Sequence, residues 1–157
     1  MSGIDNRSWL EGRYGVAQPD RFAVVRAYLV AVLGITVWVD EIPGVEQFQN
    51  LTPGLLIRGD GGQGLARNVP IGNHRIAMWA HGGTHNGLAA PEGQHQKRLA
   101  SAVQAEVEGA LWTANMEQTA FGVLIGANNV IGAQQIRDTD RDWPVVYSVW
   151  EIETKAR

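Results

Sequence analysis

The sequence KRLASAVQAEVEGALW, residues 97–112, decides the fold class, because it contains the strongest periodic pattern in the chain. Apolar residues recur there every three or four positions, which predicts an amphipathic helix. The opposite side carries Ser101, Gln104 and Glu108 and is expected to face solvent. A helix of this kind must bury its apolar stripe against another element. The stripe consists of Leu99, Ala102, Val103, Val107, Ala110 and Leu111.

A second helix is predicted over residues 20–33, upstream of this segment. Asp20 is placed to cap its N-terminus, and Gly34 is placed to end it. Its apolar residues cover much of the helix circumference, so most of the helix is expected to be buried. The predicted stripe is Phe22, Val25, Leu29 and Val32.

The remaining patterned segments predict strands, because they are rich in β-branched and aromatic residues or alternate between apolar and polar. They are residues 35–40, 55–58, 73–80, 121–126, 130–136 and 145–154. The second and third of them are expected to form a hairpin with a long connection. Glycine-rich loops are predicted over residues 59–64 and 81–96.

These elements predict an α+β fold. Four to six mostly antiparallel strands form the sheet, and the two main helices pack on one face in the order helix, strands, helix, strands. Residues 20–157 are expected to be a single domain. Residues 1–19 are polar with isolated apolar anchors, so we expect them to form an N-terminal arm that contacts a neighbouring subunit.

Composition excludes several classes of function. The 157 residues include no cysteine, which rules out disulfides and thiolate metal sites. The net charge of −3 argues against a surface dedicated to binding nucleic acid. No apolar run is long enough to span a membrane, and no secretory signal is visible, so a soluble protein made in the cytoplasm is expected.

Residues 59–64, GDGGQG, match the dinucleotide-binding pattern G-x-G-x-x-G. That site requires a helix to begin inside the motif, so that its N-terminus faces the pyrophosphate. The following residues include Pro70 and have a strand-like pattern. We therefore predict a turn at the tip of a hairpin and no bound cofactor.

The histidines and carboxylates offer weak metal-site patterns. His81 and His85 have the spacing of helical ligands, but Gly82 and Gly83 between them disfavour a helix. The run 138–142, DTDRD, resembles the start of a calcium loop but lacks the required glycine and glutamate downstream. No metal site is predicted, and the run is expected to form a charged turn.

No local arrangement supports catalysis. The chain contains no G-x-S-x-G motif, and Glu106 and Glu108 are two residues apart on a helix, where they do not share a face. The six tryptophans leave two interpretations open, a buried core or a subunit interface. Eleven arginines and only two lysines are consistent with an interface-rich protein, although a GC-rich genome gives the same bias.

The order of these segments resembles the tail terminator, or tail-completion, proteins of long-tailed phages, the family that includes the phage lambda terminator. The resemblance covers about residues 20–155. It is carried by RFAVVRAYLVAVLG (21–34), VDEIP (39–43), TPGLLIRGDGG (52–62), RIAMWA (75–80), KRLASAVQAEVEGAL (97–111) and the Trp143-Pro144 unit before the last strand. These are patterns of element order and hydrophobic type, not catalytic signatures.

The resemblance implies a structural virion protein rather than an enzyme. Family members form a hexameric ring on the last ring of tail-tube subunits, end tube growth and present the surface that joins the head-tail stopper or connector. The ring is assembled in the host cytoplasm and stays in the virion. DNA is expected to pass through a neutral or acidic lumen without specific binding, because tight phosphate contacts would hold it.

Two groups of contact residues are predicted on this basis. The two glycine-rich loops are expected to meet the tube or the stopper, since loops on a rigid scaffold commonly carry contacts. The loop residues are Asp60, Gly61, Gly62, Gln63, Arg67, His81, Thr84, His85, Asn86 and His95. The subunit interface is expected to include Trp9, Tyr14, Arg137, Asp140 and Arg141.

Two alternatives remain open. One is another neck component, such as a stopper, a connector or a minor tail protein, with similar size and charge. The other is a small metal- or ligand-binding enzyme domain that uses His81, His85 and His95, which predicts a closed pocket holding at least two of these side chains.

Overall fold

The computed structural model describes residues 20–42, 52–63, 71–83, 94–137 and 144–157. The helix α2, Arg21–Leu33, has the predicted bounds. The Asp20 carboxylate accepts hydrogen bonds from the Phe22 and Ala23 amides, and Gly34 adopts the left-handed conformation that ends the helix. Its buried side chains are Val24, Val25, Tyr28 and Leu29. Val32, predicted to be buried, is 55% exposed because it lies on the opposite side of the helix.

The helix α3, Gln94–Thr113, begins three residues earlier than predicted. Val103, Val107 and Leu111 are buried as expected, whereas Ala102 is exposed. Gln104, predicted to face solvent, is buried. Its amide donates to the Ser148 hydroxyl at 3.3 Å, so a polar contact within the core replaces the expected contact with water.

Six strands form one sheet in the order β1-β2-β3-β6-β5-β4. Their bounds are Thr36–Val39, Gly54–Gln63, Ile71–His81, Glu117–Thr119, Gly122–Arg137 and Pro144–Lys155 for β1 to β6. The short β4 was not predicted. β5 joins two predicted strands, and its pairing with β6 shifts register within this joined region, between Asn129 and Ile131 and between Ile131 and Gln134.

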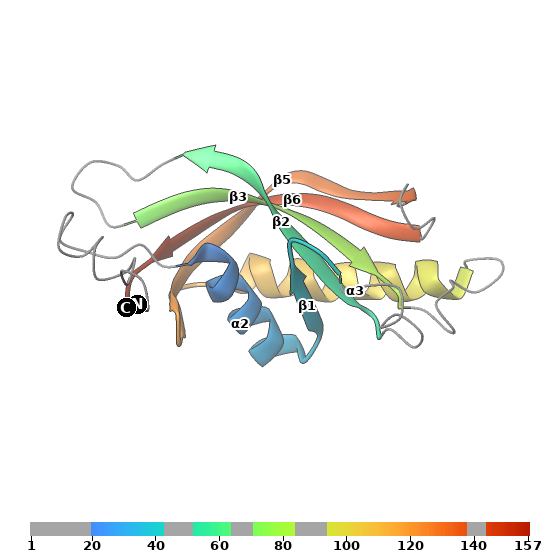
Figure 1. Ribbon diagram of the computed structural model, residues 1–157, viewed down its shortest axis with the longest axis horizontal. Coiled ribbons are helices and arrows are strands. Elements are labelled where there is room, and N and C mark those ends of the chain that lie inside the picture. The colour runs from blue at the N-terminus through green and yellow to red at the C-terminus, as the bar shows by residue number, and fades with distance from the viewer. Residues whose placement is uncertain (1–19, 43–51, 64–70, 84–93, 138–143) are drawn as a thin grey trace, which may run out of the picture.

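The sheet is mixed, because β1 runs parallel to β2 while the other neighbours are antiparallel. The prediction of a mostly antiparallel sheet with two main helices is therefore confirmed only in part. Figure 1 shows α2 and α3 on the same side of the curled sheet, with no helix over the opposite face among the described residues.

The main core lies between the sheet and the two helices, and it includes Leu29, Ile57, Met78, Val107 and Trp150. A smaller cluster of Ile42, Leu56 and Val145, flanked by Trp38 and Trp79, forms on the opposite face. The burial of Trp150 agrees with the core interpretation, and the interpretation as a subunit interface stays a prediction. Trp150 is fully buried, Trp112 is 59% exposed, and Trp9 and Trp143 lie outside the described residues.

Candidate functional site

The glycine-rich stretch predicted as a loop instead continues strand β2. Asp60, Gly61, Gly62 and Gln63 belong to this strand, and the last two pair with His74 and Asn73 of β3. The loop prediction is wrong here because glycine does not prevent pairing and the register shift between Gly59 and Gly62 absorbs the irregularity. Arg67 lies outside the described residues.

Gly59, at the start of this stretch, lies close to the side chains of the first turn of α2. A Cβ atom at this position would lie 3.3 Å from the Phe22 ring and 3.4 Å from the Arg21 guanidinium. The backbone of β2 thus passes close to the first turn of α2. The described residues 59–63 are strand, and Gly59 lies beside a helix terminus, which differs from the mobile hairpin tip that the composition predicts.

His81 is the last residue of β3 and is buried, so its assignment to an exposed loop is wrong. Its ring stacks on Trp38 with centroids 4.9 Å apart, and its Nδ1 accepts a hydrogen bond from the Gly83 amide at 3.2 Å. The strand extends this far because His81 pairs with Gly54. Gly82, the next residue, packs directly against the Gln96 backbone of α3.

Of the other residues predicted for this loop, the structure describes only the backbone position of His95. His95 lies in the first turn of α3, and Thr84, His85 and Asn86 lie outside the described residues. Within the described ranges, no group of three or more histidine, aspartate or glutamate side chains is placed to hold a metal ion.

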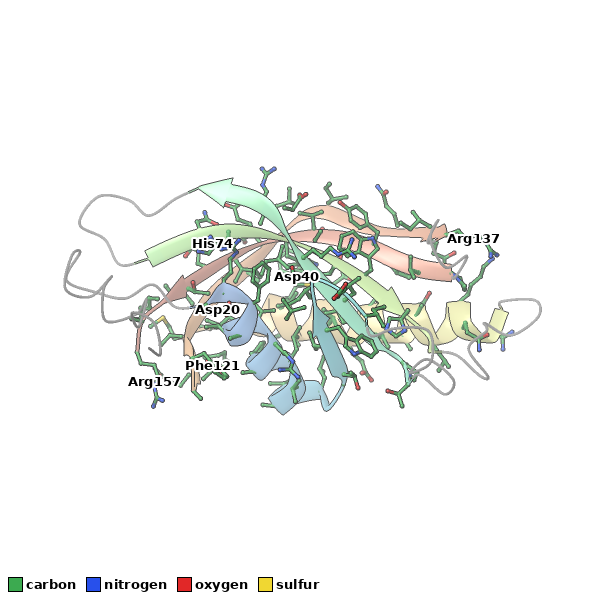
Figure 2. The ribbon with its side chains drawn as sticks, in the orientation of Figure 1. Asp20, Asp40, His74, Phe121, Arg137 and Arg157 are labelled. Carbon is green, nitrogen blue, oxygen red and sulfur yellow. The ribbon has the colours of Figure 1, made fainter. Side chains whose placement is uncertain are left out.

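Of the predicted interface residues, the structure describes Arg137, which is exposed at the end of β5. Figure 2 shows it at the opposite end of the molecule from Phe121 and Arg157. The others fall outside the described ranges. They are Trp9, Tyr14, Asp140 and Arg141.

β5 has an exposed edge that the sequence pattern did not predict. Only the first residues of β5, Gly122 to Leu124, pair with β4, so the strand from residue 126 onward has β6 as its single described neighbour. Residues 126–136 contain no charge and no proline. Val130, Ile131 and Ile136 are 38%, 36% and 40% exposed. The absence of charge was a usable signal of a strand edge that can pair with another chain, because exposed edge strands normally carry charges that prevent such pairing.

The edge at β1 differs, because its outward carbonyl groups are occupied. The Arg26 guanidinium donates to the Val37 carbonyl at 3.0 Å, and the Glu41 amide donates to the Val39 carbonyl at 2.9 Å. A strand edge whose acceptors are already bonded is a poor template for another strand. The described part of β1 is therefore protected. On β5, the Ile131 carbonyl accepts from the Asn129 side-chain amide at 2.9 Å, and no described strand lies beyond residue 125 on the outer side.

The face of the sheet without helices carries a row of large side chains. The Arg58 guanidinium lies 5.5 Å from the Trp79 ring centroid, and the Trp79 and Tyr147 centroids are 5.3 Å apart. Arginine and tryptophan at a partly exposed surface are typical of protein interfaces. This face is thus suited to contact with another protein.

A small hollow separates α3 from the ends of β5 and β6. It is lined by Lys97, Ala100, Gln135, Ile136, Pro144, Val145 and Val146 and has a volume of about 20 Å³. Small-molecule sites are typically about 300–1,000 Å³. The hollow is therefore far below the size of a substrate pocket.

Among the described residues, His74 and Tyr28 have shifted pKa values. Burial lowers the pKa of His74, and the nearby Arg21 charge lowers it further. Figure 2 shows His74 on β3 near the start of α2. Burial raises the pKa of Tyr28, as does the negative charge of Glu117. The Tyr28 hydroxyl donates to the Ala110 carbonyl at 2.8 Å and so joins the two helices. Both groups lie between packed elements, which accounts for the shifts.

The fold is similar to that of a chain in a solved structure described as the virion of a native gene transfer agent particle. The match has a TM-score of 0.54 and 18% sequence identity, and it covers 85% of this chain and 93% of the other. No protein-family model matches the sequence. No curated protein matches it either. The described helices include none that is long and apolar enough to cross a membrane.

Proposed function

We propose that this chain is a structural protein of a phage-type virion, and more specifically a tail terminator. The observation that carries the proposal is the fold, which is similar over most of both chains to that of a virion component. The resemblance in element order to tail terminators supports the specific role. The described surface adds sheet edges and an aromatic face, which suit contacts between proteins.

In this role, copies of the chain form a ring, with a hexamer expected, on the last ring of tube subunits. One face of the ring contacts the tube protein, and the other contacts the stopper or connector. DNA passes through the lumen without specific binding. Catalysis is not part of the proposal. The described features that support the structural role are sheet edges and a sheet face rather than enclosed pockets.

The experiment is assembly of the tail tube in the presence and absence of this chain. Purified tube protein is mixed with the chain, and tube lengths are measured by negative-stain electron microscopy. We expect short tubes that carry a ring at one end, and long tubes when the chain is omitted. An unchanged length distribution with no bound ring would contradict the terminator role. Binding to the stopper but not to the tube would favour the alternative neck protein.

A matched measurement tests the enzyme alternative. Elemental analysis of the purified chain is expected to find no stoichiometric metal. A monomer in solution with one bound metal ion per chain would favour a metal-binding domain that uses His81, His85 and His95.

A further inference from the structure

Apart from the protected edge of β1 and the outer side of the three-residue strand β4, two segments of described sheet edge have no described strand neighbour. One is the part of β5 from residue 126 to residue 136. The other is the end of β2, residues 59–63, which continues past β1 because β1 pairs only with Gly54 to Ile57. Figure 1 shows this end of β2 extending beyond β1. Between these two segments lie only β3 and β6, so the open segments are on opposite sides of the sheet.

We infer that the open edge of β5 pairs with the end of β2 from a second copy of this chain. The inference rests on the proposed ring and specifies the contact that closes it. A ring of identical subunits requires head-to-tail interfaces, in which each subunit contributes two different patches. Two different open edges on opposite sides of one sheet meet this requirement, whereas a single edge would not.

The strand directions agree with this pairing. β2 is antiparallel to β3, and β3 is antiparallel to β6, so β2 runs parallel to β6 and antiparallel to β5. A rotation that carries one sheet onto the next along a ring preserves strand direction. The junction is therefore antiparallel, which is the more stable form of pairing per residue.

Side-chain chemistry favours one register. Residues 59–63 contain one charge, on Asp60, and Arg137 follows the uncharged stretch of β5. When Asp60 lies opposite Arg137 of the neighbour, Gly61 and Gly62 lie opposite Ile136 and Gln135. The opposite charges then meet, and opposite-charge cross-strand pairs contribute to sheet stability. The two glycines add no side chain that would hinder approach of the strands.

The same register avoids a collision with β1. β1 pairs with β2 only up to Ile57. When Asp60 lies opposite the last residue of the neighbour's β5, the part of β2 that is paired with β1 lies beyond the end of that strand. The protected edge of β1, whose Val37 carbonyl is bonded to Arg26, is then not required to pair. Residues 60–63 of β2 then pair with residues 134–137 of the neighbour's β5, which covers one end of the open segment and leaves residues 126–133 without a described neighbour on their outer side.

The absence of cysteine allows a direct test. The double variant Gly61→Cys with Ile136→Cys places one thiol on each proposed edge. Within one chain, these strands are separated by about 14 Å, three spacings of about 4.8 Å, which exceeds the Cα distance a disulfide spans. Cross-links therefore form only between copies. After mild oxidation, we expect the monomer band on non-reducing gels to be largely replaced by a ladder of covalent oligomers.

The controls separate this contact from other modes of association. Each single variant is expected to remain monomeric on the gel, and Gly61→Cys combined with Ala105→Cys, on the exposed side of α3, is expected to give no ladder. Size-exclusion chromatography of the same samples reports whether a ring is present. Rings without a ladder would overturn the β5–β2 contact and leave the terminator role intact. A monomer in chromatography and on the gel would overturn the contact and the ring together, while the tube-length assay would still test the role.

Discussion

Ser148 of β6 joins this strand to α3 through its hydroxyl group. The side chain is fully buried, and its oxygen accepts hydrogen bonds from the Gln104 amide at 3.3 Å and from the Trp150 indole at 3.1 Å. Sequence patterning places Gln104 on the solvent side because its residue type is polar. The partner lies on β6, far along the chain, so only the tertiary structure accounts for a glutamine on the buried face.

Replacing this hydroxyl tests the network. Ser148→Ala leaves the Gln104 amide and the Trp150 N–H without an acceptor in a buried site. We expect the free energy of unfolding to fall by about 1–3 kcal/mol, the usual cost of an unsatisfied buried donor. Urea titration followed by tryptophan fluorescence measures the change, and Ser101→Ala, at a partly exposed site on α3, is the matched control. Equal stability of the two variants would show that the contacts contribute little.

His74 gives the chain a pH dependence. Its pKa is lowered in the folded state by burial and by Arg21, so the unfolded chain binds the proton more readily. The stability contributed by the neutral ring is present above the unfolded pKa of about 6.5 and is lost as pH falls through the lowered folded pKa. We expect His74→Gln to reduce the loss of melting temperature between pH 7.5 and pH 5.5. Parallel curves for both proteins would exclude His74 as a source.

At the scale of elements, local signals predict helices better than strand partners. The helix α2 matches its predicted bounds because Asp20 and Gly34 mark its ends locally. The parallel pairing of β1 with β2 has no such local signal, since strand direction is determined by the path of the connecting segment. For the same reason, glycine composition predicted loops at residues 59–63 and at His81. In the structure, residues 59–63 extend β2 by pairing with β3, and His81 extends β3 by pairing with β2.

The open β5 edge depends on the strand order and so was not predictable from periodicity. The residues that form it were visible as an uncharged stretch, but only the order β6-β5-β4 shows that its outer side lacks a described neighbour. The positions of the predicted contact residues likewise depend on strand pairing. Asp60 lies on an edge, and His81 is buried, although both were assigned to the same kind of loop.

The protected edge of β1 provides a prediction at this scale. Arg26→Ala removes the donor to the Val37 carbonyl and leaves an outward acceptor on an uncharged strand. We expect a loss of about 1 kcal/mol in stability and a concentration-dependent increase in light scattering, since an unprotected edge promotes association. Arg98→Ala, at an exposed site on α3, is the control with the same change of charge. Similar scattering by the two variants would show that Arg26 does not protect the edge.

At the scale of the whole molecule, the described core and the surfaces proposed for assembly consist of different residues. Every member of the main core cluster belongs to α2, α3 or the sheet, all within residues 20–157. The surfaces proposed for assembly lie at the periphery, on β2 and β5 and on the face that carries Trp79 and Tyr147. Changes at the periphery are therefore expected to alter association without unfolding the subunit.

Deletion of residues 1–15 tests this separation. The segment lies outside the described residues and carries the apolar anchors Trp9 and Tyr14, which are expected to contact a neighbouring subunit. We expect the truncated chain to retain its circular dichroism spectrum and cooperative unfolding, because the capped start of α2 at Asp20 is left in place. Size-exclusion chromatography with light scattering is expected to show loss of the ring in favour of smaller species. The double substitution Trp9→Ala with Tyr14→Ala in the full-length chain separates the effect of these two side chains from the effect of segment length. A ring of unchanged mass in both variants would contradict a role of the arm in the interface and would leave the sheet edges as the proposed contact.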